Sequence, residues 1–443
     1  MSQRLNTPFG NTLVIGAGPA GIHVAIDWSR RSALIGLLNR TGTHADKVAR
    51  ELHEQGCRIA VDMQVPRASH LSGEAQLFRF YNGYAGIEDI WNTIVFCTPG
   101  DSYLEAIREL MLAGMRQVRT IILISPGIGS NLLVQSVLNR QATSIELISF
   151  STYYASSRFP SDQSTVLKTV VNGLKRKVSI SSNHANSSVL PLIQAFLESQ
   201  HIRCEIVPTP LEAESRSITT YVHPPFFMNE FSLYEVFGQH SSRKFLYKLY
   251  PEGPISQHTI RTMVLLWKEI SVLLRLLGVQ PLNLLKFLND DNYPVHEETL
   301  SREDIETFPV ADEIKQQYLL YIRYSSILID PFSEPDEGGR YADFSAIAYQ
   351  QARKKDGYWT IPRIPYEDYK RLKLLHAVGE RLGFPMLHAL SLIEIFEHKL
   401  HAFIEQAGRD HIHPDLFRDE TEEHAEAITA LHSRQNGRKI GNE

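Results

Sequence analysis

Hydrophobic and polar residues follow two different patterns along the chain, and the change falls near residue 210. Before it, short apolar runs are separated by segments of helical periodicity; the runs are TLVI, ALIGLL, CRIAV, TIVFC, TIILIS and IELISF. Apolar runs of this length that alternate with helices predict a parallel sheet with helices on both faces. KRKVSISSN and RCEIVPTP are expected to add one more pair of strands. The predicted fold class is α/β.

After residue 210 the strand-like runs thin out and long helical patterns take over. The clearest are FMNEFSLYEVFG, TIRTMVLLWKEISVLLRLLG, IKQQYLLYIRYSSIL and YKRLKLLHAVGERLG. They predict a mainly α-helical domain over residues 211–415 that holds the substrate, and the charged residues 416–443 are expected to form a polar tail. The most apolar of these helices contains Lys268, Glu269 and Arg275, so we expect it to be buried and not to span a membrane.

The first predicted turn reads GAGPAG, in which Gly16, Gly18 and Gly21 complete a GxGxxG pattern. The pattern follows a predicted strand and opens a helix near Pro19, which is the setting in which it binds a dinucleotide. Gly16 permits the tight turn, and Gly18 lets the backbone approach a pyrophosphate. Gly21 allows the helix to pack on the strand, and the helix N-terminus points its N–H groups at the phosphates. Residues 1–210 are therefore expected to form a Rossmann-type doubly wound domain.

The end of the second predicted strand indicates which dinucleotide is bound. Enzymes that use NAD usually carry Asp or Glu there, to bind the ribose 2′-hydroxyl. In this chain Asn39 and Arg40 stand at that place, with Lys47 just beyond. Because a guanidinium pairs well with a phosphate, we predict NADPH as the cofactor, with Arg40 and Lys47 at the 2′-phosphate. The alternative is a solvated arginine at a strand end.

Two later strand ends face the same crevice in this topology. FCTPGDSY, which contains Thr98 and Pro99, is expected to run beside the dinucleotide. ISPGIGSN ends the next strand and is expected to flank the nicotinamide. Either run could also be a simple connecting turn.

Composition narrows the class of protein. The formal net charge of −5 provides no basic field that would attract nucleic acid or an anionic membrane. The three cysteines have neither disulfide-framework nor zinc spacing. The first ten residues, MSQRLNTPFG, lack the apolar core of a signal peptide. We therefore expect a cytoplasmic protein without a structural metal site.

One histidine stands in an unusual setting. The run TTYVHPPFFMNEF places His223 among aromatic residues and two prolines. Such a residue is either a core histidine whose nitrogens bind backbone groups or a proton donor held rigidly in a dry pocket. The residues alone leave both interpretations open.

Several long runs resemble a known family. FSTYYASSR, TTYVHPPFFMNEF, YKLYPEGPI, FLNDDNYPVHEETL, ILIDPFSEPDEGGRYADFSA and IPRIP are similar to the bacterial opine metallophore dehydrogenases. These are the staphylopine, pseudopaline and yersinopine dehydrogenase group, relatives of octopine dehydrogenase. The resemblance implies a reductive condensation that uses NADPH. An aminobutyryl-histidine amine condenses with an α-keto acid, and the opine that is released chelates a metal ion.

The resemblance also implies roles for particular residues. The histidine of the YVHPP-type motif is the family's general acid/base, and it falls on His223. Some members carry an aspartate where this chain has Ser156, so either that carboxylate is dispensable or another group replaces it. Tyr153 is considered a cleft residue.

Other polar residues have two open interpretations. Lys248, Asn289 and Arg216, which precedes the strand expected to carry the histidine, are candidates to bind substrate. Turn formation or structural ion pairing explains them equally well. His411 and His413 form an HxH pair, but without a third ligand in sight a solvated tail is the stronger interpretation.

Two further functions remain as alternatives. A ketopantoate-reductase-like keto-acid dehydrogenase would not need an amine, and a non-catalytic NADPH-binding regulator would turn over nothing. The run VHPPFFMN slightly favours pyruvate over 2-oxoglutarate as the keto acid. A homodimer and a nicotianamine-synthase-like pathway neighbour are what the family implies.

Overall fold

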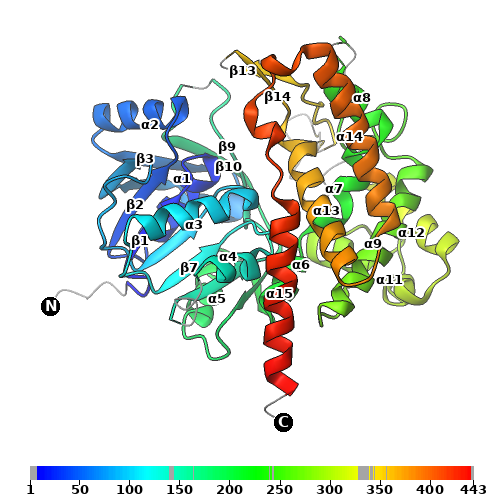
Figure 1. The fold of residues 1–443 in the computed structure, drawn as a ribbon, viewed down its shortest axis with the longest axis horizontal. Helices are drawn as coiled ribbons and strands as arrows, with labels where there is room; N and C mark the ends of the chain where they lie inside the picture. The colour runs from blue at the N-terminus through cyan, green and yellow to red at the C-terminus, as the bar shows by residue number, and fades with distance from the viewer. Residues whose placement is uncertain are drawn as a thin grey trace. The chain divides into compact units, whose positions relative to one another are not determined.

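The computed structural model describes residues 7–138, 144–162, 164–238, 240–241, 244–327, 339, 343, 345–355 and 357–440. Most of the run ILIDPFSEPDEGGRYADFSA lies outside the described residues. The chain forms two compact units, Met1–Ser217 and Ile218–Glu443 (Figure 1). We call them the first and the second unit.

In the described part of the first unit, an eight-stranded sheet has the order β12-β11-β8-β7-β6-β1-β2-β5. Its neighbours are parallel except β8 and β11, which are antiparallel. Its strands are β1 (Asn11–Ile15), β2 (Leu34–Asn39), β5 (Arg79–Asn82), β6 (Thr93–Phe96), β7 (Thr120–Leu123), β8 (Glu146–Phe150), β11 (Lys177–Ser182) and β12 (Arg203–Ile206). The doubly wound sheet and both added strands are confirmed.

Successive residues of the central strands point into two different cores. Leu13 and Ile15 of β1 face one cluster with helix α3 (Tyr103–Leu112) and helix α4 (Ser130–Leu138), which lie next to each other. Val14 faces the other cluster with helix α1 (Pro19–Ser29). Because both faces of the sheet are covered, its strands are continuously apolar rather than alternating. This is the feature that made them visible in the sequence.

A second sheet corrects one sequence expectation. The run CRIAV forms β3, but β3 belongs to a four-stranded sheet of the order β4-β3-β10-β9, and β5 takes the place beside β2. The strands are β3 (Arg58–Met63), β4 (Gly73–Gln76), β9 (Ala155–Arg158) and β10 (Lys168–Leu174). Helix α1 packs against strands of both sheets, so strands of either sheet become apolar. Local pattern therefore could not tell which sheet CRIAV joins. Helices α2 (Thr43–Glu54), α5 (Leu190–Glu198) and α6 (Pro210–Ser215) complete the unit.

The second unit is mainly helical, as expected. Its longer helices are α7 (Ile218–Phe227), α8 (Glu230–Phe237), α9 (Gln257–Leu276), α12 (Glu313–Ser326), α13 (Arg363–Arg381), α14 (Leu387–Ala407) and α15 (Thr421–Ile440). Shorter elements are α10 (Leu284–Lys286), a π-helical turn (Phe287–Asn292), α11 (Arg302–Thr307) and the hairpin of β13 (Arg353–Lys355) and β14 (Tyr358–Thr360). Helix α7 packs against α9 and α13, and α14 packs against α8, α9 and α13.

The segment that carries His223 is a helix and not the expected strand. Pro224 and Pro225 lie inside α7, near its end, where they remove two backbone donors and stop the helix. The amide of Asn229 donates to the carbonyls of Pro225 and Phe226, at 2.8 and 3.0 Å. Its carbonyl oxygen also accepts from the first turn of α8, so one side chain closes one helix and begins the next.

The C-terminal segment also differs from expectation. Residues 421–440 form helix α15, which packs against α13, and Ala425 and Ile428 are fully buried. The apolar positions in it are too sparse to reveal this contact. The expected polar tail therefore contains a long helix, with buried positions between residues 425 and 432.

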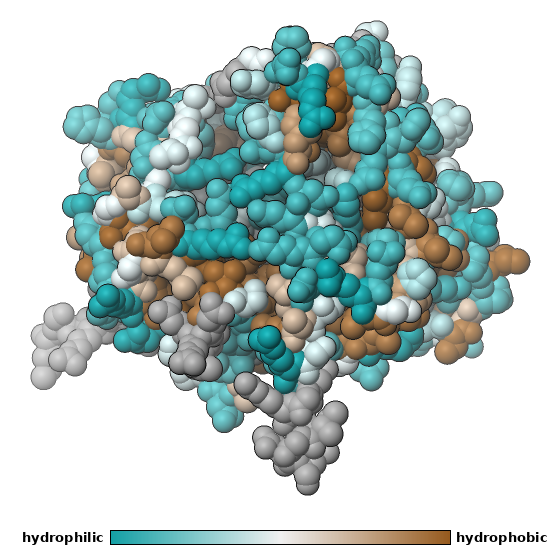
Figure 2. Space-filling view, in the orientation of Figure 1, coloured by the Kyte–Doolittle hydropathy of each residue, from teal (hydrophilic) through white to brown (hydrophobic). Residues whose placement is uncertain are grey.

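Polar residues cover most of the face in Figure 2. In the described part of the chain, no helix is both long enough and apolar enough to cross a bilayer.

Candidate active site

The glycine turn after β1 has the shape expected of a dinucleotide site. Gly16 has φ +107°, where a side chain would be strained. A Cβ on Gly21 would lie 1.6 Å from the carbonyl oxygen of Gly16, so only glycine fits there. A Cβ on Gly18 would meet no atom within 4 Å. Gly16 and Gly21 therefore shape the turn, and Gly18 leaves its backbone open to a ligand.

Two groups next to this turn lack partners. Helix α1 begins at Pro19 without a side-chain cap from Gly18 and without an acidic residue in its first turn. The hydroxyl of Thr98, on the loop after β6, is buried and has no hydrogen-bond partner among the described residues. An open helix N-terminus and an orphaned hydroxyl suit a polar, anionic ligand. Pro99 follows as an exposed residue. The residues present therefore fit a dinucleotide.

Asn39 and Arg40, at the end of β2, have different surroundings. The carbonyl oxygen of Asn39 accepts from the N–H of Ala17 at 3.0 Å, so this side chain holds the glycine turn. Arg40 is exposed and makes no ion pair with any described residue. Lys47 lies one turn into α2, with its Nζ 3.7 Å from Glu51. Arg40 is thus unpaired among the described residues and Lys47 is only loosely paired. Binding of the 2′-phosphate by these two side chains stays a prediction.

The loop after β7 is held by a carboxylate that sequence reasoning missed. Glu214 is fully buried, and its carboxylate accepts from the N–H groups of Gly129 and Asn131, both at 2.8 Å. The hydroxyl of Ser149 donates to it at 2.9 Å. Burial raises the pKa of Glu214 to about 8, although these three donors favour the ionised form. Glu214 thus fixes the run ISPGIGSN as a rigid turn.

In the second unit His223 is paired with a carboxylate. Its Nδ1 lies 3.1 and 3.2 Å from the two carboxylate oxygens of Asp368. The histidine comes from α7 and the aspartate from α13, which pack together. The side chains are 14% and 6% exposed, so the pair is shielded from bulk water but is not sealed. The ring of Phe227 packs edge-on against the imidazole, with centroids 4.9 Å apart.

This pairing determines which ring nitrogen of His223 is left for proton transfer. Because Nδ1 donates to Asp368, the neutral ring carries its lone pair on Nε2. Nε2 has no hydrogen-bond partner in the described part of the chain and can take up or release a proton. A carboxylate behind an imidazole orients the ring and stabilises its charged form. Asp368 is therefore a carboxylate beside His223, a kind of group that the serine at position 156 does not provide.

Sequence reasoning did not find Asp368. It is 145 residues from His223 and sits in YEDYK, next to the run IPRIP that carries the family resemblance. Nothing local marks one carboxylate among the many on helical segments. The packing of α7 on α13 is the information that was missing.

Tyr153 is half-buried and its hydroxyl belongs to a hydrogen-bonded network, while its place in a cleft stays a prediction. Its hydroxyl is 2.7 Å from Nδ1 of His23 and 3.1 Å from Ser157. Nε2 of His23 lies 3.1 Å from Asp27, although it is poorly aligned for a hydrogen bond. Asp27 also accepts from Tyr154 at 3.0 Å. Despite burial, His23, Arg30 and these donors hold the pKa of Asp27 below its usual value.

Two other candidate substrate residues are engaged in ion pairs. Arg216 pairs with Glu205 at 2.5 Å and with Glu212 at 2.6 Å. Lys248 pairs with Asp343 at 2.8 Å. These contacts favour the structural interpretation of both cations, and their substrate role remains untested.

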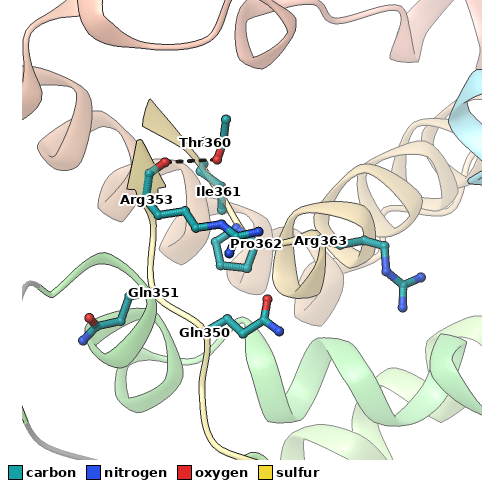
Figure 3. Close-up of a pocket in the computed structure, with 7 residues that line it drawn as sticks. All are labelled: Gln350, Gln351, Arg353, Thr360, Ile361, Pro362 and Arg363. Carbon is teal, nitrogen blue, oxygen red and sulfur yellow. Dashed lines mark hydrogen bonds between the residues drawn. The ribbon is translucent and has the colours of Figure 1, made fainter. Parts of the chain in front are cut away.

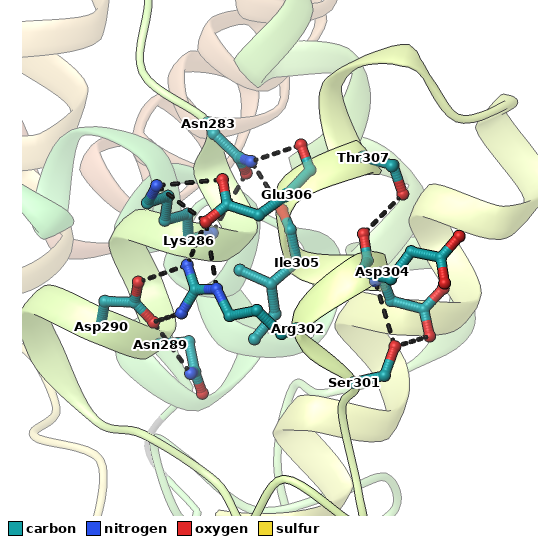
Figure 4. A network of polar contacts seen from close by, with 11 residues as sticks. Asn283, Lys286, Asn289, Asp290, Ser301, Arg302, Asp304, Ile305, Glu306 and Thr307 are labelled. Atoms are coloured by element: carbon teal, nitrogen blue, oxygen red, sulfur yellow. Dashed lines mark hydrogen bonds and ion pairs between the residues drawn. The ribbon is translucent and has the colours of Figure 1, made fainter.

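Asn289 holds a turn. Its carbonyl oxygen accepts from the N–H of Val295 at 2.9 Å, and its amide donates to Asp290 at 3.2 Å. Asp290 in turn pairs with Arg302, so the π-helical turn is tied to α11 (Figure 4). The contacts of Asn289 are structural, and its substrate role is a prediction without support here.

The HxH pair also has local partners. Nδ1 of His411 lies 3.0 Å from the carbonyl oxygen of Ala407, and Nδ1 of His413 accepts from the N–H of Asp415 at 3.3 Å. Among the described residues no cluster of three His, Cys, Asp or Glu side chains could hold a metal ion.

Comparison with known proteins gives a consistent result. Residues 10–431 match the family model described as staphylopine dehydrogenase. The pseudopaline synthase of Pseudomonas aeruginosa is 40% identical over 423 residues, which cover 95% of this chain and 96% of that protein. The staphylopine synthase of Staphylococcus aureus is 38% identical over 380 residues, covering 85% and 88%.

Solved structures show the same relationship. The NADP⁺-bound structure of yersinopine dehydrogenase has a TM-score of 0.88 and 30% identity, covering 96% of this chain and 99% of that one. A structure of octopine dehydrogenase with NADH and pyruvate has a TM-score of 0.61 at 13% identity, covering 88% of each chain, which shows a shared fold alone.

Proposed function

The chain belongs to the staphylopine dehydrogenase family, and we propose that it is an NADPH-dependent opine dehydrogenase. It joins an aminobutyryl-histidine amine to an α-keto acid and reduces the product to a secondary amine. The observation that carries this proposal is the His223–Asp368 pair, because it supplies the proton donor that such a condensation needs.

The residues of the pair act on the condensation step. Attack of the amine on the keto carbon gives a carbinolamine, which loses water only after its hydroxyl is protonated. Nε2 of His223 donates that proton, and the carboxylate of Asp368 stabilises the imidazolium ring before and the neutral tautomer after the transfer. When bound, NADPH supplies the hydride that reduces the resulting C=N bond. Phe227 excludes water from one side of the ring.

The cofactor assignment rests on the first unit. The open helix N-terminus at Pro19 and the orphaned hydroxyl of Thr98 fit a dinucleotide. Arg40 without an acidic partner favours NADPH over NADH, in agreement with the relative solved with NADP⁺. In the Arg40→Ala variant we expect KM for NADPH to rise about tenfold and KM for NADH to stay unchanged. An equal change for both coenzymes would remove this assignment.

The proposal also covers the keto acid, the oligomeric state, the compartment and the source of the amine. Pyruvate is favoured over 2-oxoglutarate because of the run VHPPFFMN. The enzyme acts as a homodimer in the cytoplasm, and a nicotianamine-synthase-like enzyme provides the amine. The described thiols are free, which agrees with a reducing compartment.

The experiment is a complete reaction followed by absorbance. Purified protein is mixed with NADPH, the aminobutyryl-histidine amine and either pyruvate or 2-oxoglutarate. Loss of the NADPH absorbance only when amine and keto acid are both present is the expected result, and mass spectrometry of the product identifies the keto acid. Oxidation without the amine would point to a simple keto-acid reductase. No oxidation with either keto acid would refute the proposed function.

A further inference from the structure

A pocket of about 380 Å³ lies in the second unit, where the β13–β14 hairpin meets the start of α13 (Figure 3). Its volume is at the low end of the range for small-molecule sites and suits one polar group of a ligand. It is lined by Gln350, Gln351, Arg353, Thr360, Ile361, Pro362 and Arg363.

The lining contains two guanidinium groups and no carboxylate. Arg363 is compensated, because it pairs with Glu367 at 2.9 Å. Arg353 has neither an ion pair nor a side-chain hydrogen bond with any residue that the structure describes. Figure 3 shows the side chain of Arg353 extending toward Pro362, and that of Gln350 extending to the same side of the chain, below Pro362 in this view. A free guanidinium beside a free amide donor is a pair of groups that recognises a carboxylate.

Helix α13 connects this pocket to the His223–Asp368 pair. Arg363 begins the helix and Asp368 follows five residues later. The regular part of the helix, from Pro365 to Asp368, rises by about 5 Å. The surroundings of Tyr247 indicate the same proximity. Burial raises the pKa of its phenol, the charge of Asp368 raises it further, and the charge of Arg363 lowers it, so both charges lie near this one side chain. The lining residue Arg363 is thus separated from Asp368 by the non-helical residue Ile364 and about one turn of regular helix.

We propose that this pocket binds the histidine-end carboxylate of the amine substrate, with Arg353 as the principal cation and Gln350 as a neutral donor. The inference rests on the proposed function. The keto acid's carboxylate is bonded to the carbon that reacts, so it must lie beside His223. The carboxylate at the histidine end is several bonds from the reacting nitrogen and can extend along the start of α13 toward this pocket. The site therefore selects an amine that carries a second acidic group.

The test compares two ligands on two proteins. Calorimetry measures the Kd of aminobutyryl-histidine and of the analogue whose histidine carboxylate is a carboxamide, on wild type and on Arg353→Gln. Because Arg353 is exposed, the expected effect is moderate. Wild type should bind the acid about fivefold more tightly than the amide, and the variant should bind both equally. If the ratio of the two Kd values, acid against amide, is the same in wild type and in Arg353→Gln, the proposal is overturned.

Steady-state kinetics locates the effect. Arg353→Gln should raise KM for the amine about fivefold and leave kcat, KM for NADPH and KM for the keto acid within about twofold. Lys355→Gln is the matched control, because it removes one charge from the same strand but does not line the pocket. A rise in KM for the keto acid alone, or an equal effect of Lys355→Gln, would contradict the assignment.

Two further experiments distinguish failure of the pocket proposal from misfolding of the variant and from failure of the proposed function. If Arg353→Gln does not fold, as judged by its thermal unfolding, Gln350→Leu removes the neutral donor instead and should weaken acid binding about twofold. If wild type shows no turnover, the proposed function fails, while the calorimetric comparison of acid and amide still decides the pocket.

Discussion

Two histidine–aspartate pairs in this protein look alike in composition and differ in their surroundings. His23 and Asp27 lie one turn apart on α1, with side chains 0% and 1% exposed. Tyr153 binds Nδ1 of His23, Tyr154 and Gln200 donate to the Asp27 oxygen that faces His23, and Arg30 donates to the other oxygen. His223 and Asp368 come from two helices, the histidine is partly exposed, and its Nε2 has no partner among the described residues. The buried pair is surrounded by side chains of the core, which favours a structural role, whereas the other pair leaves one ring nitrogen that can take up or release a proton.

The largest effect should follow removal of the second-unit imidazole. We expect His223→Asn to lower kcat about 1,000-fold, because general acid–base groups contribute roughly 10² to 10⁴. The melting temperature should stay close to that of wild type, since the ring is near the edge of the core. Activity within tenfold of wild type would show that the two pairs do not differ as described.

A smaller loss should follow when the ring keeps its place but loses its charge partner. In Asp368→Asn the amide still accepts from Nδ1 but cannot stabilise the imidazolium, so we expect kcat to fall about 100-fold. KM for both substrates should change little, which a merely structural role would not predict. The NADPH assay gives kcat and KM separately, and an unaltered kcat would exclude Asp368 from the mechanism.

The buried pair should respond in the opposite way. Asp27→Asn leaves His23, Tyr154 and Gln200 with a weaker acceptor, so we expect the free energy of unfolding to drop by about 2 kcal/mol. Activity per folded molecule should remain within about twofold of wild type. Urea unfolding followed by circular dichroism measures the stability, and a stable variant with low activity would reverse the two roles.

The acid dependence of stability sharpens the same comparison. The pKa of Asp27 is lowered in the folded protein, so its stabilising effect is present above the unfolded-state pKa, about 3.9, and is lost as the pH falls below it. The stability difference between wild type and Asp27→Asn should therefore shrink from pH 7 toward pH 3. A difference that grows on acidification would mean that the carboxylate is protonated when folded.

The sequence showed the central strands because both of their faces are buried, and it showed the glycine turn because only glycine fits at Gly21. It did not show that β5 would replace β3 beside β2, since the short run RFYN carries little apolar signal. Among the candidate site residues, His223 was visible through its motif. The carboxylates Asp368 and Glu214 were not visible, because their partners are 145 and 65 to 85 residues away and depend on tertiary packing.

Chemical rescue tests the central claim most directly, because it separates the loss of a proton donor from any other damage. In His223→Gly, added imidazole should restore part of the NADPH oxidation that depends on the amine, in proportion to its concentration. The same imidazole should leave wild type and Asp27→Asn unaffected. If His223→Gly without imidazole retains the wild-type rate, His223 is not the proton donor.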